Sequence, residues 1–269
     1  MTLDKLVGTA AAAVADIPDG ASLAVGGFGL AGIPWILIEA LLEQGASDLT
    51  IVSNNCGVDG AGLGLLLEAR RISRVTASYV GENKEFARQF RAGELTVELT
   101  PQGTLAERLR AGGSGIGAFF TPTGVGTLVA EGGLPWRFEP DGSVAVASPP
   151  KEVRTFHGRE MVLEESIVTD YALIRAAIAD KAGNCRFHAG ARNFNPPVAM
   201  SGRITIVEAE QVVEVGELDP DAIHLPGIFV KRIVALTPEQ ASRKDIEKRT
   251  TRPRPDDEPP TDDEQGATQ

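Results

Sequence analysis

A glycine-rich stretch near the amino terminus has the residue types and spacing of a ligand-binding loop. It reads Gly26-Gly27-Phe28-Gly29-Leu30-Ala31-Gly32-Ile33-Pro34 and follows the apolar run Leu23–Val25. Glycine tolerates positive φ and lets a ligand approach the backbone without meeting a Cβ atom, and proline fits the first turn of a helix. A strand, a glycine loop and a helix N-terminus in this order favour binding of an anionic or carbonyl oxygen by backbone N–H groups.

The spacing of Gly27, Gly29 and Gly32 also matches the nucleotide-binding pattern G-x-G-x-x-G, which is a weak signal by itself. A dinucleotide site would carry an acidic residue at the end of the next strand, where it binds the adenosine ribose. The next apolar run, Leu49–Ser53, is followed by two asparagines instead. A nicotinamide-dependent dehydrogenase is therefore an alternative that these residues disfavour.

Three side-chain amides follow predicted strands and could face one crevice. Asn54 and Asn55 come at the carboxyl end of a strand, where open α/β sheets bind ligands, and adjacent amides can donate to a carboxylate or carbonyl. Gln102 precedes a helix that Thr104 or Gly103 can cap, and its amide could polarise a carbonyl as an oxyanion hole does. The structural alternatives are an asparagine turn and a solvated glutamine.

Two further glycine-dense loops, residues 111–117 and 121–127, are predicted on the same rim. Together these glycine-rich or amide-bearing loops indicate a site that binds something bulky through backbone contacts. Other catalytic motifs are missing, because the sequence has no Gly-x-Ser-x-Gly elbow, no Gly-x4-Gly-Lys-Ser/Thr loop and no metal-ligand spacing among its histidines. Cys56, beside the asparagines, is expected to be a buried and unreactive thiol.

Short strands and helices alternate along the first half of the chain, which predicts βαβ units and a parallel sheet. Strands are predicted at 23–25, 49–53, 75–80, 95–99 and 118–121, and helices at 3–16, 34–44, 63–70, 84–92 and 104–111. Interleaved Pro, Gly and charges predict a small antiparallel insertion at 134–165, after which strand-like runs resume at 172–179, 204–208 and 228–234.

We therefore predict an α/β fold with a mostly parallel sheet flanked by helices, in one domain over residues 1–250. The acidic, proline-rich tail at 251–269 has too little apolar surface to order itself, so we expect it to be disordered.

Composition limits the classes of function. The 269 residues are 42% hydrophobic, which suits one large α/β domain with a sizeable core. A net charge of −11 argues against nucleic acid as a partner. No apolar run approaches the ~20 residues of a membrane span, so we expect no membrane association, and the first residues do not resemble a signal peptide. The two cysteines, Cys56 and Cys185, form no spacing motif, so we expect a cytoplasmic protein.

Ordered blocks along most of the chain match one known family. They are Gly26-Gly27-Phe28-x3-Gly32-x-Pro34, Ser53-Asn54-Asn55-x-Gly57, Ser78-Tyr79-x-Gly81-Glu82-Asn83-Lys84-Glu85-Phe86, Gly93-Glu94-Leu95, Pro101-Gln102-Gly103-Thr104-Leu105-Ala106-Glu107-Arg108, Ala111-Gly112-Gly113, Thr121-Pro122-Thr123-Gly124-Val125-Gly126-Thr127, Ala191-Arg192-Asn193-Phe194-Asn195-Pro196 and Gly216-Glu217-Leu218. The chain thereby resembles family I CoA-transferases from about residue 3 to 235, and within them the A (alpha) subunits of succinyl-CoA:3-oxoacid enzymes. The block from Gly81 to Phe86 favours the succinyl/acetoacetate type over the oxoadipate type.

The resemblance implies a ping-pong transfer of CoA. A glutamate carboxylate attacks the acyl-CoA thioester and gives an acyl-glutamyl anhydride plus CoA thiolate. The thiolate then forms a glutamyl-CoA thioester and releases the acid, and the acceptor acid reverses both steps. CoA thioester is thus a substrate, and no permanently bound cofactor or metal is expected.

In the family this glutamate belongs to the B (beta) subunit, within a Ser-Glu-Asn-Gly turn. The nearest stretches here, Gly81-Glu82-Asn83 and Glu164-Glu165-Ser166, lack that order. The resemblance therefore implies an enzyme that is active only with a B subunit, as an α2β2 heterotetramer. It implies that Gln102 contacts the thioester or anhydride oxygen, that Asn54 and Asn55 line the carboxylate pocket, and that the Gly26–Gly32 loop is the CoA-binding stretch.

Two other functions stay open at this point. The chain could be a subunit of a 3-oxoadipate or short-chain fatty acid CoA-transferase. It could also be a non-catalytic module that binds a sugar phosphate on the same kind of sheet.

Overall fold

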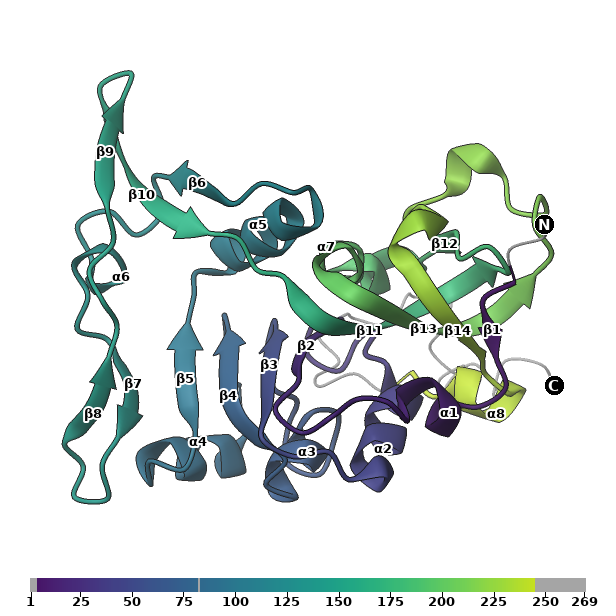
Figure 1. The fold of residues 1–269 in the computed structure, drawn as a ribbon, viewed down its shortest axis with the longest axis horizontal. Coiled ribbons are helices and arrows are strands. Elements are labelled where there is room, and N and C mark those ends of the chain that lie inside the picture. The colour runs from purple at the N-terminus through teal and green to yellow at the C-terminus, as the bar shows by residue number, and fades with distance from the viewer. Residues whose placement is uncertain (1–3, 82, 245–269) are drawn as a thin grey trace, which may run out of the picture.

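The computed structural model describes residues 4–81 and 83–244, so the acidic segment 251–269 and Glu82 lie outside the described residues. A nine-stranded sheet forms the centre of the molecule (Figure 1). Its main path runs β1 (Leu6–Val7), β14 (Val230–Ala235), β13 (Gly202–Val213), β11 (Thr169–Asp180), β2 (Ser22–Val25), β3 (Leu49–Ser53), β4 (Ile72–Ala77) and β5 (Thr96–Leu99). All neighbours on this path are parallel, and only β12 (Cys185–Arg186) is antiparallel, beside β11. The predicted mostly parallel sheet is confirmed.

Helices cover both faces of this sheet. One core includes α1 (Ala10–Val14), α2 (Trp35–Gln44), α3 (Gly64–Glu68) and α4 (Lys84–Arg91), and the other includes α5 (Gln102–Gly113) and α7 (Asn195–Ser201). Successive residues of a strand point to opposite faces, so Leu23 and Val25 pack in the first core and Ala24 packs in the second. The short helix α8 (Pro238–Ser242) contacts β13 near the end of the described chain.

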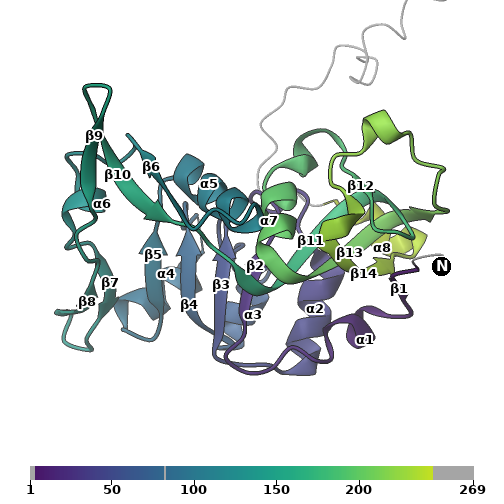
Figure 2. The same cartoon turned by 45° about the horizontal axis from the view of Figure 1, so that its top comes forward.

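A β-rich arm stands beside β5, between α5 and β11 in the sequence (Figures 1 and 2). It contains β6 (Ala118–Thr121), α6 (Leu128–Glu131), the hairpin of β7 (Pro135–Phe138) and β8 (Val144–Ala147), and β9 (Val153–Phe156) with β10 (Arg159–Glu165). The strand at 118–121 was predicted in the parallel sheet, and this placement is wrong because β6 pairs antiparallel with β10. Its partner lies about 40 residues later, beyond what a local strand pattern can indicate.

The helix predicted at 3–16 is also partly wrong. Residues 6–7 form β1, which pairs with Ile233 and Val234 of β14, and the helix covers only Ala10–Val14. Thr9 begins this helix by accepting a hydrogen bond from the Ala12 amide, 3.1 Å away. The apolar spacing is continuous across this break, so the periodicity alone overestimates the length of the helix.

The sheet topology reverses between β2 and β11. From β2 the chain steps through β3 and β4 to β5, and it then returns through the arm to add β11 on the other side of β2. Ligands of open α/β sheets bind at the carboxyl ends of strands near such a reversal. No helix within residues 4–81 and 83–244 is long and apolar enough to cross a membrane.

Candidate active site at the carboxyl edge of the sheet

Side-chain hydrogen bonds join the carboxyl ends of β2, β3 and β4. The Ser53 hydroxyl donates to the Val25 carbonyl at 2.8 Å, and the Asn54 amide nitrogen donates to the Ser78 hydroxyl at 2.9 Å. The loops that follow these strands therefore lie together on one edge. The structure thus brings the Gly26–Gly32 loop and the two asparagines to the same edge of the sheet, as predicted for parallel strands.

The Gly26–Gly32 loop makes a tight turn. The backbones of Phe28 and Ala31 exchange two hydrogen bonds of 3.1 and 3.0 Å, which leaves the Phe28 side chain 49% exposed. The loop after β3 repeats this geometry between Val58 and Ala61. The two loops pack on each other through a small apolar cluster that contains Leu30, Ile33, Trp35, Val58 and Ala61.

Two glycines of this loop are required because other residues of the protein pack directly against their Cα atoms. A Cβ atom on Gly26 would lie 2.0 Å from Asn195 Oδ1, and one on Gly32, where φ is +70°, would lie 2.7 Å from the Ala191 carbonyl. We expected the missing Cβ atoms to make room for a ligand. At these two positions they make room instead for residues 191–195, which lead into α7 and form its first residue.

Sequence reasoning gave no role to the asparagines of that segment. The Asn195 amide nitrogen donates to the Gly32 carbonyl at 3.0 Å, while its oxygen accepts from the Arg175 backbone amide at 3.2 Å. The amide nitrogen of Asn193 donates to the Ala31 carbonyl at 3.0 Å. Both residues stand in one of the blocks that carry the family resemblance, and that block was the available signal.

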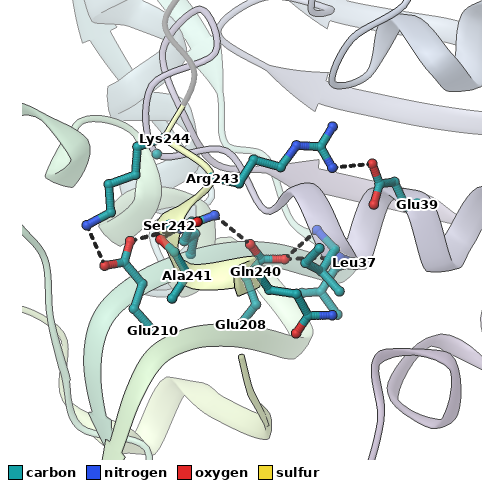
Figure 3. Close-up of polar contacts among 12 residues, drawn as sticks. Leu37, Glu39, Glu208, Glu210, Gln240, Ala241, Ser242, Arg243 and Lys244 are labelled. Carbon is teal, nitrogen blue, oxygen red and sulfur yellow. Dashed lines mark hydrogen bonds and ion pairs between the residues drawn. The ribbon is translucent and has the colours of Figure 1, made fainter. Parts of the chain in front are cut away.

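The N-terminus of α2 does not offer its first amides to a ligand. Glu208 of β13 accepts hydrogen bonds from the Ile36 and Leu37 amides at 2.9 and 3.0 Å (Figure 3). Its side chain is fully buried, and burial raises its pKa to about 7, against the lowering effect of the Leu37 amide and the Arg175 guanidinium. The anion site predicted from the strand, loop and helix order is therefore already occupied by a protein carboxylate.

The two asparagines differ in what their amides contact. Asn54 is 1% exposed and uses its amide nitrogen within the protein, on Ser78. Asn55 is 4% exposed, and its amide nitrogen is buried without a hydrogen-bond partner. A buried donor without a partner costs free energy of about 1–3 kcal/mol, so Asn55 is the residue of the pair whose amide nitrogen still lacks an acceptor.

Gln102 lies at the first position of α5, and Pro101 is the N-cap. The sequence predicted that Thr104 or Gly103 caps this helix, which is wrong, because Pro101, which lacks a backbone N–H and is tolerated at a helix start, is the N-cap and the helix begins at Gln102. Gln102 is exposed, and no side chain caps the helix. Thr104 is instead buried in the first turn, and its hydroxyl has no hydrogen-bond partner.

Cys56 follows Asn55 and is completely buried, and burial raises the pKa of its thiol far above the ordinary range. A thiol in this state is a poor nucleophile, as expected. The two other glycine-dense loops do not share the rim. Residues 114–117 follow α5 and lead into β6, and residues 122–127 join β6 to α6 within the arm, so neither loop follows a strand of the main sheet.

A pocket of about 140 Å³ lies at the reversal between β2 and β11. Its lining includes Leu30, Ile33, Trp35, Arg175, Phe187 and His188. Asn54, Asn55 and Gln102 do not line it. The mostly apolar pocket and the amide-bearing rim are therefore distinct features, and the end of the glycine loop lines the pocket.

Comparisons with known proteins agree with the fold and the motifs. The chain is 62% identical to the A subunit of the probable succinyl-CoA:3-ketoacid coenzyme A transferase of Mycobacterium tuberculosis, over 93% of this chain and 100% of that protein. It is 54% identical to the human mitochondrial succinyl-CoA:3-ketoacid coenzyme A transferase 2, over 82% of this chain but only 43% of the human protein.

Among solved structures, the chain is similar to the acyl-CoA transferase YdiF from Escherichia coli O157:H7, in a thioester complex with CoA. The TM-score is 0.73 at 23% identity, over 88% of this chain and 48% of YdiF, so this chain spans about half the length of that protein. Residues 7–236 match the family described as coenzyme A transferase. This chain therefore belongs to the coenzyme A transferase family.

Proposed function

We propose that this chain is the A subunit of a succinyl-CoA:3-ketoacid CoA-transferase, which moves CoA between succinyl-CoA and a 3-oxoacid such as acetoacetate. The observation that carries the proposal is the 62% identity to an A subunit of that description along that protein's whole length. The nicotinamide-dependent dehydrogenase loses its structural support, because Glu208 occupies the amides that a nucleotide phosphate would need.

The catalytic partner in this proposal is a B subunit that supplies the nucleophilic glutamate, in an α2β2 assembly. The human relative supports a second half of this kind, since this chain matches less than half of its length. CoA thioesters are the substrates, and no tightly bound cofactor is invoked. Both cysteines are free and buried, which suits the reducing cytoplasm that we propose as the location.

The rim residues have separate roles in this reaction. Asn55 donates its unpartnered amide to the carboxylate of the acid substrate, and Asn54 holds the end of β3 against Ser78. Gln102, at the uncapped start of α5, contacts the thioester or anhydride oxygen as charge develops on it. The Gly26–Gly32 loop forms the wall of the CoA-binding crevice behind them.

Asn55→Asp is expected to raise KM for the acid substrate by about tenfold, because a carboxylate would replace the donor and repel the substrate's own carboxylate. KM for the acyl-CoA should change less. Steady-state kinetics of the two-subunit enzyme with each substrate varied in turn would measure both values. Asn54→Asp is the matched control, and an equal effect on KM from both variants would contradict the assignment of Asn55.

The substrates are tested with the chain co-purified with its B subunit. Succinyl-CoA is offered with acetoacetate, 3-oxoadipate or butyrate in parallel, and formation of each new CoA thioester is followed by chromatography. We expect kcat/KM for acetoacetate to exceed the other two values by at least about tenfold. Preference for 3-oxoadipate or butyrate would assign the chain to a related transferase, and absence of transfer to any acid would overturn the proposed function.

A further inference from the structure

We infer that Glu208 is a positioning residue, which caps the N-terminus of α2 from the centre of the sheet and thereby fixes the Gly26–Gly32 loop. The consequence for kinetics rests on the proposed function, in which this loop borders the CoA crevice. The structural part of the inference rests on the contacts of the loop and α2 alone.

The need for a remote cap arises from the sequence at the start of α2. The first turns of a helix leave backbone N–H groups without partners, and a Ser, Thr, Asp or Asn at the N-cap usually binds one of them. Here the N-cap is Pro34, which has no side chain that can accept a hydrogen bond. Glu208 lies 172 and 171 residues away in sequence and accepts from Ile36 and Leu37 with one carboxylate oxygen.

The geometry selects a carboxylate for this task. The positive end of the helix dipole favours the ionised form of this buried carboxyl, and its second oxygen accepts from Arg175 Nη1 at 3.4 Å. Glu208 and Arg175 are 0% and 5% exposed. Glu208 is thus the one described side chain that joins α2 to the β11–β13 pair by a charged hydrogen bond to backbone amides.

Arg175 and Leu173, both on β11, extend the connection to the two ends of the loop. The Arg175 guanidinium also donates to Glu210 and to the Ala241 carbonyl of α8, and its backbone amide donates to Asn195, which holds the Gly32 carbonyl. At the start of the loop, the Gly26 backbone amide donates a hydrogen bond to the Leu173 carbonyl of β11. The loop is therefore held at its start and its end by β11 and its neighbours, and Glu208 holds the helix that follows it.

Other charges face this network from the neighbouring elements. Arg243, just after α8, pairs with Glu39 of α2, and Lys244 pairs with Glu210 at 2.9 Å (Figure 3). The Arg243 guanidinium also lies 4.2 Å from the centre of the Trp35 ring. These contacts are at least partly exposed, so each stabilises α2 less than the buried carboxylate does. They explain how the end of the described chain packs over α2 without replacing its cap.

The test compares three variants of the two-subunit enzyme. Glu208→Gln keeps the length of the side chain and removes its charge, and Glu208→Asp keeps the charge and shortens the reach to α2. Glu210→Gln is the matched control, because Glu210 lies on the same strand and binds the same arginine, while its other partner is Lys244 rather than an amide of α2. We expect both Glu208 variants to raise KM for succinyl-CoA by about tenfold while kcat stays within about threefold, and the control to change neither.

Hydrogen exchange separates this inference from the proposed function, since it needs no substrate. In the wild-type chain the Ile36 and Leu37 amides should exchange at least about a hundredfold more slowly than free amides. In the Glu208→Gln variant the same two amides should exchange about tenfold faster than in the wild type. Peptides from β3 should be unchanged. Fast exchange of these two amides in the wild type, or variant kinetics equal to those of the control, would overturn the inference. Normal exchange results without transferase activity would overturn only the proposed function.

Discussion

Purified without its partner, the chain is expected to transfer CoA from succinyl-CoA to acetoacetate at least roughly 10⁴-fold more slowly than the assembled enzyme, the scale of losing a covalent nucleophile. The described residues of the rim offer amides, a hydroxyl and a buried thiol whose pKa is raised by burial, and we expect none of them to attack a thioester. Two carboxylates on the main sheet are already engaged. Glu98 pairs with Arg74 and Arg108, and Glu208 caps α2.

The measurement uses the same preparation twice. The chain alone is assayed first, and activity is then measured after addition of the separately purified B subunit, which should restore it in proportion to the amount added. Circular dichroism before addition establishes that the isolated chain is folded. Intact-protein mass spectrometry during turnover should find the CoA adduct on the partner, and an adduct on this chain would show that the nucleophile lies here.

Features that depend on local sequence were predicted well. The strand at Leu49–Ser53 and the helix after Pro34 follow from an apolar run and from helical periodicity, and the structure confirms both. The position of the predicted crevice followed from the rule that the carboxyl ends of parallel strands lie at the same edge of a sheet. Asn54 and Asn55 accordingly lie at the edge where they were expected.

Features that depend on contacts between distant segments were not predicted. Nothing local indicates that residues 6–7 would pair with β14 more than 220 residues later, or that β6 would leave the parallel sheet. Asn54 and Asn55 are the same residue type at neighbouring positions, so the sequence cannot tell them apart. Only the hydrogen bonds of the structure show that the Asn54 amide nitrogen has a partner and that the Asn55 amide nitrogen has none. The same holds for Glu208, because its partners on α2 are brought to it only by the folded sheet.

The helix ends give the clearest example of this limit. Both α2 and α5 follow a strand of the sheet, and both begin after a proline N-cap without a capping side chain. Their sequences therefore predict the same free amides at each start. In the structure a distant carboxylate occupies the amides of α2, while the start of α5 stays exposed beside Gln102. We therefore propose that the start of α5, rather than the glycine loop, binds the substrate oxygen.

Gln102→Ala is accordingly expected to lower kcat of the two-subunit enzyme by roughly 10²-fold, the usual effect of removing one donor to a developing oxyanion. KM for succinyl-CoA should change little, because the contact strengthens only as the thioester oxygen gains charge. Stability should not change measurably, since the side chain is exposed at the start of α5 and such substitutions usually shift the free energy of unfolding by no more than about 0.5 kcal/mol.

Glu107→Ala on the same helix is the matched control. Glu107 is exposed and pairs with Arg110 at 2.8 Å, one turn further along α5, so its loss tests whether any surface change on this helix alters turnover. Gln102→Asn adds a second comparison, because it keeps the amide but withdraws it by one methylene group and should recover part of the rate only if the oxygen lies within reach. A fall in kcat of less than threefold for Gln102→Ala, or an equal fall for the control, would place the oxyanion donor elsewhere. The next residue to substitute would then be Thr104 in the same turn, whose buried hydroxyl has no hydrogen-bond partner among the described residues.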